Sequence, residues 1–417
     1  MSHLTKRLIS AGLFLTVANV MAGGLGYLFQ VLIGRMLVPS DFALFSAIMS
    51  VSVILTSPIS AVFTVTSRNI TQLFAAGYSS FALKSYKKFT KICIFGSAIL
   101  IIGSLVFEQQ ITSYINNSTQ IQIVFLSIII LCSALGMMNN AYLQGGQKFE
   151  WLAAMSVTTV IFKIVVVCTL ISLGYGVDGA LLGVVISSIG AYFIVNFYIR
   201  NQYRKSTGAD HNDRVSDVFN FNKLLPVLIA TLSITVMTQL DVVVVNNYFD
   251  PDIAGKYAAA ATLGKAVLYL PGGIILALLP MVAEAQAKKN KVANFIVIAS
   301  IATFLTCSCA ALVYWEFGGY ISALLFGERY SGVGEILKYY GFAMLPMAML
   351  VVAEYFLIAL GKVIYAWLSL LFAPLQVLLI IIYHESVYQV LLIIGFCGFL
   401  LLISGYFFLF RFLRSQD

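Results

Sequence analysis

Four charged side chains lie inside stretches of this sequence that are otherwise apolar: Lys163, Asp241, Lys265 and Glu354. An ionised side chain at the centre of a bilayer costs about 3 kcal/mol even on lenient insertion scales, so it normally faces a cavity or a partner. Lysine suits an anionic group, and a carboxylate can carry a proton or a metal cation. These residues are therefore the first candidates for a site inside a membrane.

Asp241 and Lys265 flank one predicted outer turn at comparable depth, which predicts an ion pair. The pair could be a structural salt bridge, or it could open when a substrate or a coupling cation binds. Lys163 has no acidic residue nearby in its own apolar stretch, so we expect it to hold an anionic group. Glu354 could carry H⁺ or Na⁺, or simply bond a neighbouring helix.

The composition requires a membrane around these residues. Of the 417 residues 60% are hydrophobic and 10% are charged, and the mean hydropathy is +0.95. Apolar runs of about 20 residues predict an all-α polytopic membrane protein with twelve transmembrane helices. The predicted spans are 9–33, 42–66, 89–107, 121–143, 152–173, 177–199, 223–247, 257–283, 292–314, 336–359, 363–383 and 388–411.

The basic residues predict the orientation, because short loops rich in Lys and Arg stay in the cytoplasm. With both termini in the cytoplasm, only Arg35, Lys256, Arg329 and Lys338 fall on the outer side. Lys163 and Lys265 lie inside spans, and every other Lys and Arg is cytoplasmic. The net charge of +8 is thereby explained by topology and anionic headgroups, so we expect no nucleic-acid partner.

The chain is expected to have two halves: a six-helix lobe over residues 1–200, a cytoplasmic linker over 201–222 and a second six-helix lobe over 223–417. Three weak matches recur at nearly constant spacing: Pro39 with Pro251, Pro58 with Pro271, and Lys148 with Lys362. An even number of spans per lobe predicts an axis along the membrane normal, with a site between the lobes near mid-membrane.

Helical periodicity places further polar residues on shared faces. Asn19 and Gln30 share a face of the first span, Asn140 and Gln144 share one of the fourth, and Gln239 lies beside Asp241 in the seventh. Stripes of small and polar residues are also produced by tight helix packing. Both interpretations stay open for these faces.

Several sequence features argue against ATP hydrolysis, a metal centre and glycosyltransferase chemistry. No GxxxxGK[ST] phosphate loop is present, so active transport would draw on an ion gradient or on the gradient of the substrate. All six cysteines lie in apolar spans and the three histidines lie in loops or the N-terminal tail, so we expect no metal centre. Asp250–Pro251–Asp252 predicts a helix start rather than the metal motif of a glycosyltransferase.

Two stretches carry a family resemblance. They are GRMLVPSDFALFSAIMSV (34–51) and DVVVVNNYFDPDIAGKYAAAATL (241–263). Both resemble the polysaccharide-transporter branch of the multidrug/oligosaccharidyl-lipid/polysaccharide exporter superfamily. This branch contains the Wzx-type O-antigen flippases. The matching positions are Arg35, Leu37, Pro39, Asp41, Phe42 or Phe45, Asp241, Gly255, Tyr257 and Ala260. GYGVDGA at 174–180 resembles the family's outer turn between spans five and six, whereas Ala43 and Asn246–Asn247 depart from the family pattern.

The resemblance implies a MATE-like fold, and translocation of an undecaprenyl-diphosphate-linked oligosaccharide across the bacterial cytoplasmic (inner) membrane by alternating access. The product would serve O-antigen, capsule or exopolysaccharide assembly, with a polysaccharide polymerase and a chain-length regulator as expected partners beside membrane lipids. On this interpretation Lys163 and Lys265 hold the diphosphate or an acidic sugar, and Asp241 and Glu354 couple transport to H⁺ or Na⁺, with no other cofactor. The remaining substrate contacts are expected from Arg35, Asn19, Gln30, Asn140, Gln144 and Gln239.

Other functions remain open at this point. A MATE-type cation-coupled drug exporter would favour acidic and aromatic residues in its cavity, whereas intramembrane Lys is as frequent here as acid. A membrane-embedded glycan transferase or ligase should have a large outer loop with catalytic His, Arg or Asp, and the longest outer loops contain no His. A non-transporting scaffold is a further alternative. The lipid II flippases of the superfamily have fourteen spans, which argues against that branch.

Overall fold

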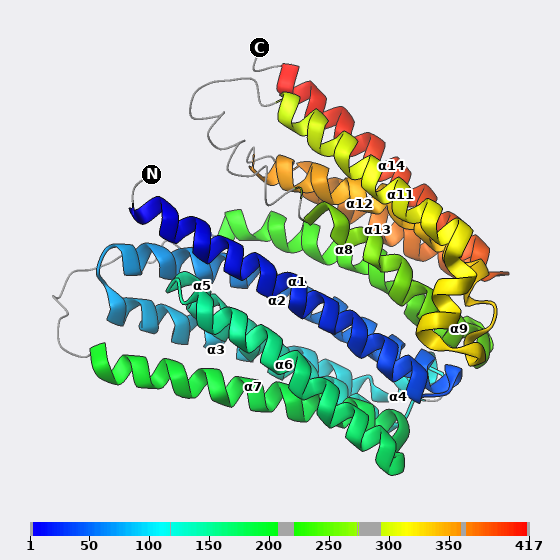
Figure 1. The fold of residues 1–417 in the computed structure, drawn as a ribbon, viewed down its shortest axis with the longest axis horizontal. Helices are drawn as coiled ribbons and strands as arrows, with labels where there is room; N and C mark the ends of the chain where they lie inside the picture. Colours follow the sequence, from blue (N-terminus) through cyan, green and yellow to red (C-terminus); the bar gives the residue numbers. More distant parts are fainter. Residues whose placement is uncertain are drawn as a thin grey trace. The chain divides into compact units, whose positions relative to one another are not determined.

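The computed structural model describes residues 3–116, 118–206, 221–272, 274, 293–359 and 364–414. Helices cover almost all of these residues, and no strand occurs among them. The all-α fold class predicted from the sequence is therefore confirmed. The chain divides into two compact units, Met1–Leu37 with Val51–Leu228, and Val38–Ser50 with Ile229–Asp417, whose helices are labelled in chain order in Figure 1.

The first unit is built around a core of α2, α3, α5 and α7. Ile70, Phe89, Met138 and Ile199 are among the buried side chains of this core, and α1 packs against α6. The unit contains α1 (His3–Met36), most of α2 (Pro39–Ala75), α3 (Ser79–Val106), α4 (Glu108–Tyr114), α5 (Gln120–Gly145), α6 (Phe149–Leu170), the π-helical turn η1 (Ile171–Tyr175) and α7 (Gly176–Ser206).

A sharp turn separates α6 from α7. Gly174 and Gly176 adopt φ values of 91° and 50°, which a residue with a Cβ atom rarely reaches. After the turn the two helices run side by side, and a Cβ atom on Gly183 would lie 2.6 Å from Val167 Cγ2. Gly179 and Gly183 thus contribute to a close contact between α6 and α7.

The second unit is organised around α12, which packs against α9, α11 and α14. A Cβ atom on Gly264 would lie 2.2 Å from the ring of Tyr340, so glycine at this position lets α12 approach α9. The unit contains the main part of α8 (Phe221–Tyr248), α9 (Pro251–Gly264), the 3₁₀ turn η2 (Lys265–Tyr269), α11 (Ala293–Phe326), the 3₁₀ turn η3 (Glu328–Tyr330), α12 (Val333–Ala359), α13 (Ile364–Ile382) and α14 (Val387–Arg414).

The first turns of α2 belong to the second unit rather than the first. The Phe42 ring lies 5.9 Å from that of Phe326 and 6.2 Å from that of Tyr330, measured between ring centroids. A Cβ atom on Gly255 would lie 2.1 Å from the carbonyl oxygen of Pro39. The lobe predicted over residues 1–200 therefore differs from the compact units, because residues 38–50 bury their aromatic side chains against α11 and η3.

Within the described residues, nine helices are long and apolar enough to cross a membrane, counting α6 and α7 together as Phe149–Asn201. A shorter apolar helix covers Val20–Met36, and each predicted span overlaps a described helix. The protein is thus a multi-pass membrane protein. The count of twelve spans, the lobe boundaries and the symmetry axis stay predictions.

Candidate functional site

Asp241 on α8 is the centre of a buried polar cluster in the second unit. Its carboxylate is fully buried. Oδ2 accepts hydrogen bonds from the hydroxyl of Tyr257 on α9 at 3.0 Å and from that of Tyr340 on α12 at 2.5 Å. Oδ1 accepts a hydrogen bond from Lys265 Nζ at 3.2 Å, which is also an ion pair. The ion pair predicted from the sequence is therefore confirmed.

Gln239, one helical half-turn before Asp241, extends the cluster. Its Oε1 accepts hydrogen bonds from Lys265 Nζ at 3.2 Å and from the Ser50 hydroxyl at 3.4 Å. Ser50 is the last α2 residue assigned to the second unit. The side chain of Lys265 is thus held by two oxygens of α8, and one of these also contacts α2.

Local sequence explains how these elements meet. Asp250 caps α9, because its Oδ1 accepts a hydrogen bond from the backbone N–H of Asp252 at 2.9 Å and Pro251 occupies the first helical turn. The helix start predicted for Asp250–Pro251–Asp252 is confirmed. The tight turn lays α9 beside α8, so Tyr257 reaches Asp241. At Lys265 the chain changes from α to 3₁₀ geometry, a change that often marks a functional hinge.

The burial of this ion pair has a large energetic consequence. Removing a charge from water costs several kcal/mol, and the cost is recovered only when the remaining lone pairs are hydrogen-bonded. The two tyrosine hydroxyls supply these bonds to the carboxylate. Asp241 has no exposed surface, whereas the Lys265 side chain keeps 11% of its surface exposed. Of this ion pair, only Lys265 is thus accessible at the surface.

Replacing Tyr340 with Phe is expected to lower the free energy of unfolding by about 1.5–3 kcal/mol, because one hydrogen bond to a buried charge is lost. Tyr257→Phe should act in the same direction. The matched control is Tyr330→Phe, since the buried Tyr330 hydroxyl has no partner among the described residues. The apparent melting temperature in detergent measures the effect. Equal melting temperatures for Tyr340→Phe and Tyr330→Phe would contradict the assignment.

The structure places the second candidate cation, Lys163 of α6, in the first unit. Its Nζ lies 4.2 Å from the centroid of the Phe29 ring on α1. A cation over an aromatic face is stabilised by the ring quadrupole, which is a weaker interaction than a buried ion pair. Lys163 thus has an aromatic partner within the first unit.

Glu354 on α12 is half-buried, and the described residues offer it neither an ion pair nor a hydrogen bond. It interacts electrostatically with Tyr355 and with Tyr365 of α13. The Tyr365 hydroxyl is buried and has no hydrogen-bond partner among the described residues. Among the described residues, fewer polar side chains thus have a hydrogen-bond partner around Glu354 than around Asp241. Across the described chain, no three His, Cys, Asp or Glu side chains form a group that could hold a metal ion.

Most of the other predicted substrate contacts belong to the first unit. Gln30 on α1 and both Asn140 and Gln144 on α5 are half-buried in the first unit, and Arg35 is exposed near the end of α1. The side chain of Asn19 lies outside the described residues. Gln239 belongs to the Asp241 cluster, and the substrate-binding roles of all these residues stay predictions.

Sequence reasoning missed three members of the cluster: Tyr257, Tyr340 and Ser50. Tyr257 stood in the family motif without a role, and its place 16 residues after Asp241 was the available signal. Tyr340 is 99 residues from Asp241 and Ser50 is 189 residues from Gln239. No local pattern could have connected residues so far apart. In the first unit, sequence reasoning selected Asn140 and missed its neighbour Asn139. Asn139 is buried and accepts a hydrogen bond from the Tyr86 hydroxyl at 2.6 Å.

Comparison with known proteins provides independent information. Residues 9–286 match the family model described as polysaccharide biosynthesis protein. A comparison with curated protein sequences gave no match. Among solved structures, an inward-facing MATE family multidrug resistance transporter of the MOP superfamily aligns with a TM-score of 0.69 and 12% identity, covering 94% of each chain.

Two further structures show the same fold. The lipid II flippase MurJ in an inward closed conformation has a TM-score of 0.68 and 16% identity, covering 95% of this chain and 87% of its own. A MOP superfamily transporter from Pyrococcus furiosus has a TM-score of 0.59 and 14% identity, covering 97% and 96%. Since the family model spans more than half of the chain, this protein belongs to the polysaccharide biosynthesis protein family and has the fold of the MOP superfamily transporters.

Proposed function

We propose that this protein is a flippase that moves undecaprenyl-diphosphate-linked oligosaccharides across the bacterial cytoplasmic membrane. The oligosaccharide would be a repeat unit for O-antigen, capsule or exopolysaccharide assembly. Membership of the polysaccharide biosynthesis family and a fold shared with a lipid II flippase support this proposal. The observation that carries its mechanism is the partly exposed Lys265 held by the fully buried Asp241.

In this mechanism the cargo competes with Asp241 for one cation. A diphosphate that reaches Lys265 offers its own oxygens to Nζ, in place of Asp241 Oδ1 and Gln239 Oε1. Asp241 then keeps the two tyrosine hydroxyls but loses its counter-charge. A buried carboxylate without a counter-charge is strongly destabilised, so it takes up H⁺ or Na⁺.

Cation uptake and cargo binding therefore support each other. The coupling must be reciprocal, since each ligand changes the affinity for the other by the same factor. Glu354 is a second candidate for the coupling cation, because the Tyr365 hydroxyl in its neighbourhood is buried and unpaired among the described residues. The structure of the Asp241 cluster thus supplies a physical reason for ion-coupled alternating access.

Other polar residues would bind the rest of the cargo. Lys163 would add a second positive charge for the diphosphate or an acidic sugar. Sugar hydroxyls need amide and hydroxyl partners, which half-buried amides at membrane depth can provide. The residues proposed for these contacts are Asn19, Gln30, Asn140, Gln144 and Gln239, with Arg35 as a further cationic contact. The proposed protein has twelve spans, with both termini in the cytoplasm. It would cooperate with a polysaccharide polymerase and a chain-length regulator.

Replacing Lys163 and Lys265 together with Ala tests this function. In a strain lacking its own flippase, the double variant is expected to reduce surface glycan more than about tenfold, since two charge-assisted contacts of about 1.5–3 kcal/mol each are removed. Lipid-linked oligosaccharide should accumulate in the inner leaflet. Surface glycan is measured by labelling, with membrane protein levels matched by immunoblot.

The control is Lys256→Gln, which removes an α9 lysine that also pairs with an aspartate, Asp252, at 2.7 Å. This variant should keep normal surface glycan. Unchanged glycan in the Lys163→Ala/Lys265→Ala variant would overturn the assignment of a cationic site. A wild-type protein that fails to restore glycan but protects cells from cationic dyes would instead indicate a drug exporter.

A further inference from the structure

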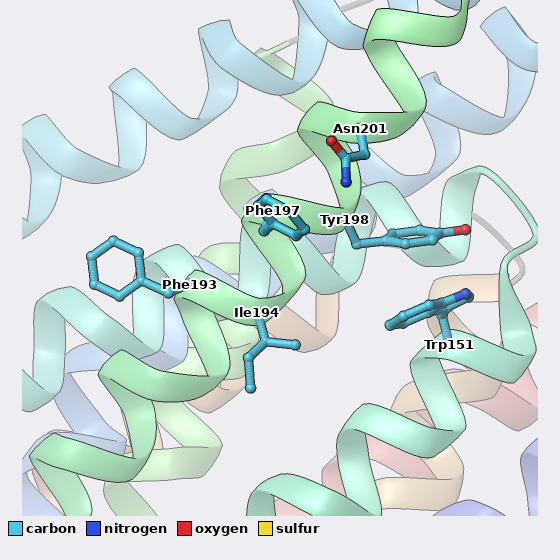
Figure 2. A pocket seen from close by; sticks show the side chains of 6 residues that line it. All are labelled: Trp151, Phe193, Ile194, Phe197, Tyr198 and Asn201. Atoms are coloured by element: carbon cyan, nitrogen blue, oxygen red, sulfur yellow. The ribbon is translucent and has the colours of Figure 1, made fainter.

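A groove lined by aromatic residues lies between α6 and α7 in the first unit. Its volume is about 540 Å³, and its lining residues are Trp151, Phe193, Ile194, Phe197, Tyr198 and Asn201. Figure 2 shows Trp151 and Tyr198 with their rings face to face across the two helices. The ring centroids are 4.1 Å apart and the rings are inclined by 28°. The groove therefore has one wall fixed by a stacked aromatic pair.

The sequence of α7 explains why the groove opens here. Closer to the turn that joins the helices, Gly183 packs on Val167, and a Cβ atom on Gly190 would lie 3.2 Å from the Phe162 ring. After Gly190, α7 contains no glycine. The bulky Phe193 and Phe197 remain 64% and 68% exposed. The helices are close where glycine permits it, and beyond that point large side chains border an open groove.

The polar groups of the groove gather at one end. Three lining side chains carry a polar group. These groups are the amide of Asn201, the hydroxyl of Tyr198 and the indole N–H of Trp151. The exposed Arg200 precedes it, and helical periodicity places Arg200 on the face of Phe193, seven residues earlier. Lys148, also exposed, lies one turn before Trp151, beside the acidic Glu150. The described charges around this end are thus predominantly positive.

This arrangement matches one class of ligand. The Lys and Arg distribution assigns this end to the cytoplasmic side, where anionic lipids are attracted to basic residues. Trp and Tyr favour the level of the headgroups. Apolar rings below a cationic end complement a hydrocarbon chain below a phosphate. A volume of about 540 Å³ lies within the range of about 300–1,000 Å³ that holds small ligands.

We propose that this groove is a binding site for an anionic glycerophospholipid, with one acyl chain along Phe193, Ile194 and Phe197 and the phosphate at Arg200. The site belongs to the first unit alone and does not depend on the cargo proposed above. The bound lipid is a resident ligand of α6 and α7 rather than transported material.

Native mass spectrometry of the purified protein tests the proposal. The protein in detergent is incubated with phosphatidylglycerol or with phosphatidylcholine of the same chains, and bound lipids are counted. We expect phosphatidylglycerol to be retained in preference to phosphatidylcholine. Arg200→Gln should lower its apparent affinity about fivefold, the effect of one basic residue near a membrane surface. Phe197→Ala should weaken both lipids.

Two control variants separate a built site from a general surface effect. Lys84→Gln removes an exposed basic residue that lies 4.7 Å from the Phe81 ring centroid, and Phe95→Ala removes a ring that is 70% exposed on α3. Both should leave phosphatidylglycerol binding unchanged. Equal losses in the controls and the groove variants would overturn the site. Preferential displacement of phosphatidylglycerol by a polyprenyl phosphate would overturn the choice of occupant.

Discussion

Asp241→Ala is expected to destabilise the protein by about 3–5 kcal/mol, the range measured when one partner of a buried ion pair is removed. The change leaves Lys265 without its counter-charge and the hydroxyls of Tyr257 and Tyr340 without their acceptor. The effect should exceed that of Tyr340→Phe, which removes a single bond. The apparent melting temperature and the folded yield in detergent measure the loss.

The pairing itself is tested by the neutral double variant Asp241→Asn/Lys265→Gln. Asparagine retains an acceptor oxygen for the tyrosine hydroxyls, and glutamine removes the unpaired cation. Because residues in direct contact show non-additive effects, the double variant should be more stable than Asp241→Asn alone. A double variant that shows the sum of the two single losses would contradict direct coupling between these side chains.

The same double variant distinguishes a structural lock from a gate. A lock depends only on packing and pairing, so a neutral pair that restores stability would also restore transport. A gate requires a cation for the cargo and a carboxylate for the coupling ion, and the neutral pair supplies neither. We therefore expect stability to recover while surface glycan stays low. Recovery of both would contradict a role of Asp241 and Lys265 in transport.

The sequence predicted those features that depend on short range or on composition. The apolar runs predicted the all-α membrane fold, and the cost of charge in lipid directed attention to Asp241 and Lys265. Their separation of 24 residues corresponds to one predicted hairpin, so their contact could be inferred. Asp250 and Pro251 predicted the start of α9 through their capping chemistry.

The missed features depend on contacts that no periodicity encodes. Tyr340 reaches Asp241 because Gly264 leaves room for its ring, and such a fit between α9 and α12 is a property of packing. The first turns of α2 were assigned to the first lobe by position in the chain. Their place in the second unit follows from aromatic contacts of Phe42 with Phe326 and Tyr330, residues almost 300 positions away.

Gly255→Ala is expected to detach the first turns of α2 from α9 and to destabilise the second unit by about 3 kcal/mol, the upper end of the usual cost of overpacking. The new Cβ atom would lie 2.1 Å from the oxygen, 2.3 Å from the carbonyl carbon and 2.7 Å from the Cα atom of Pro39. All three atoms belong to the backbone, so no rotamer change can relieve the overlap. Either α2 or α9 must move.

The movement should reach the polar cluster, because Ser50 on α2 donates a hydrogen bond to Gln239, which also holds Lys265. We therefore expect Gly255→Ala to lower both the apparent melting temperature and surface glycan. Gly319→Ala is the matched control, since a Cβ atom there meets nothing within 4 Å and the residue is helical. A Gly255→Ala protein with the melting temperature of the Gly319→Ala protein would show that Pro39 and α9 are not in contact. In that case the hydrogen bond from Ser50 to Gln239 would not depend on the packing of α2 against α9.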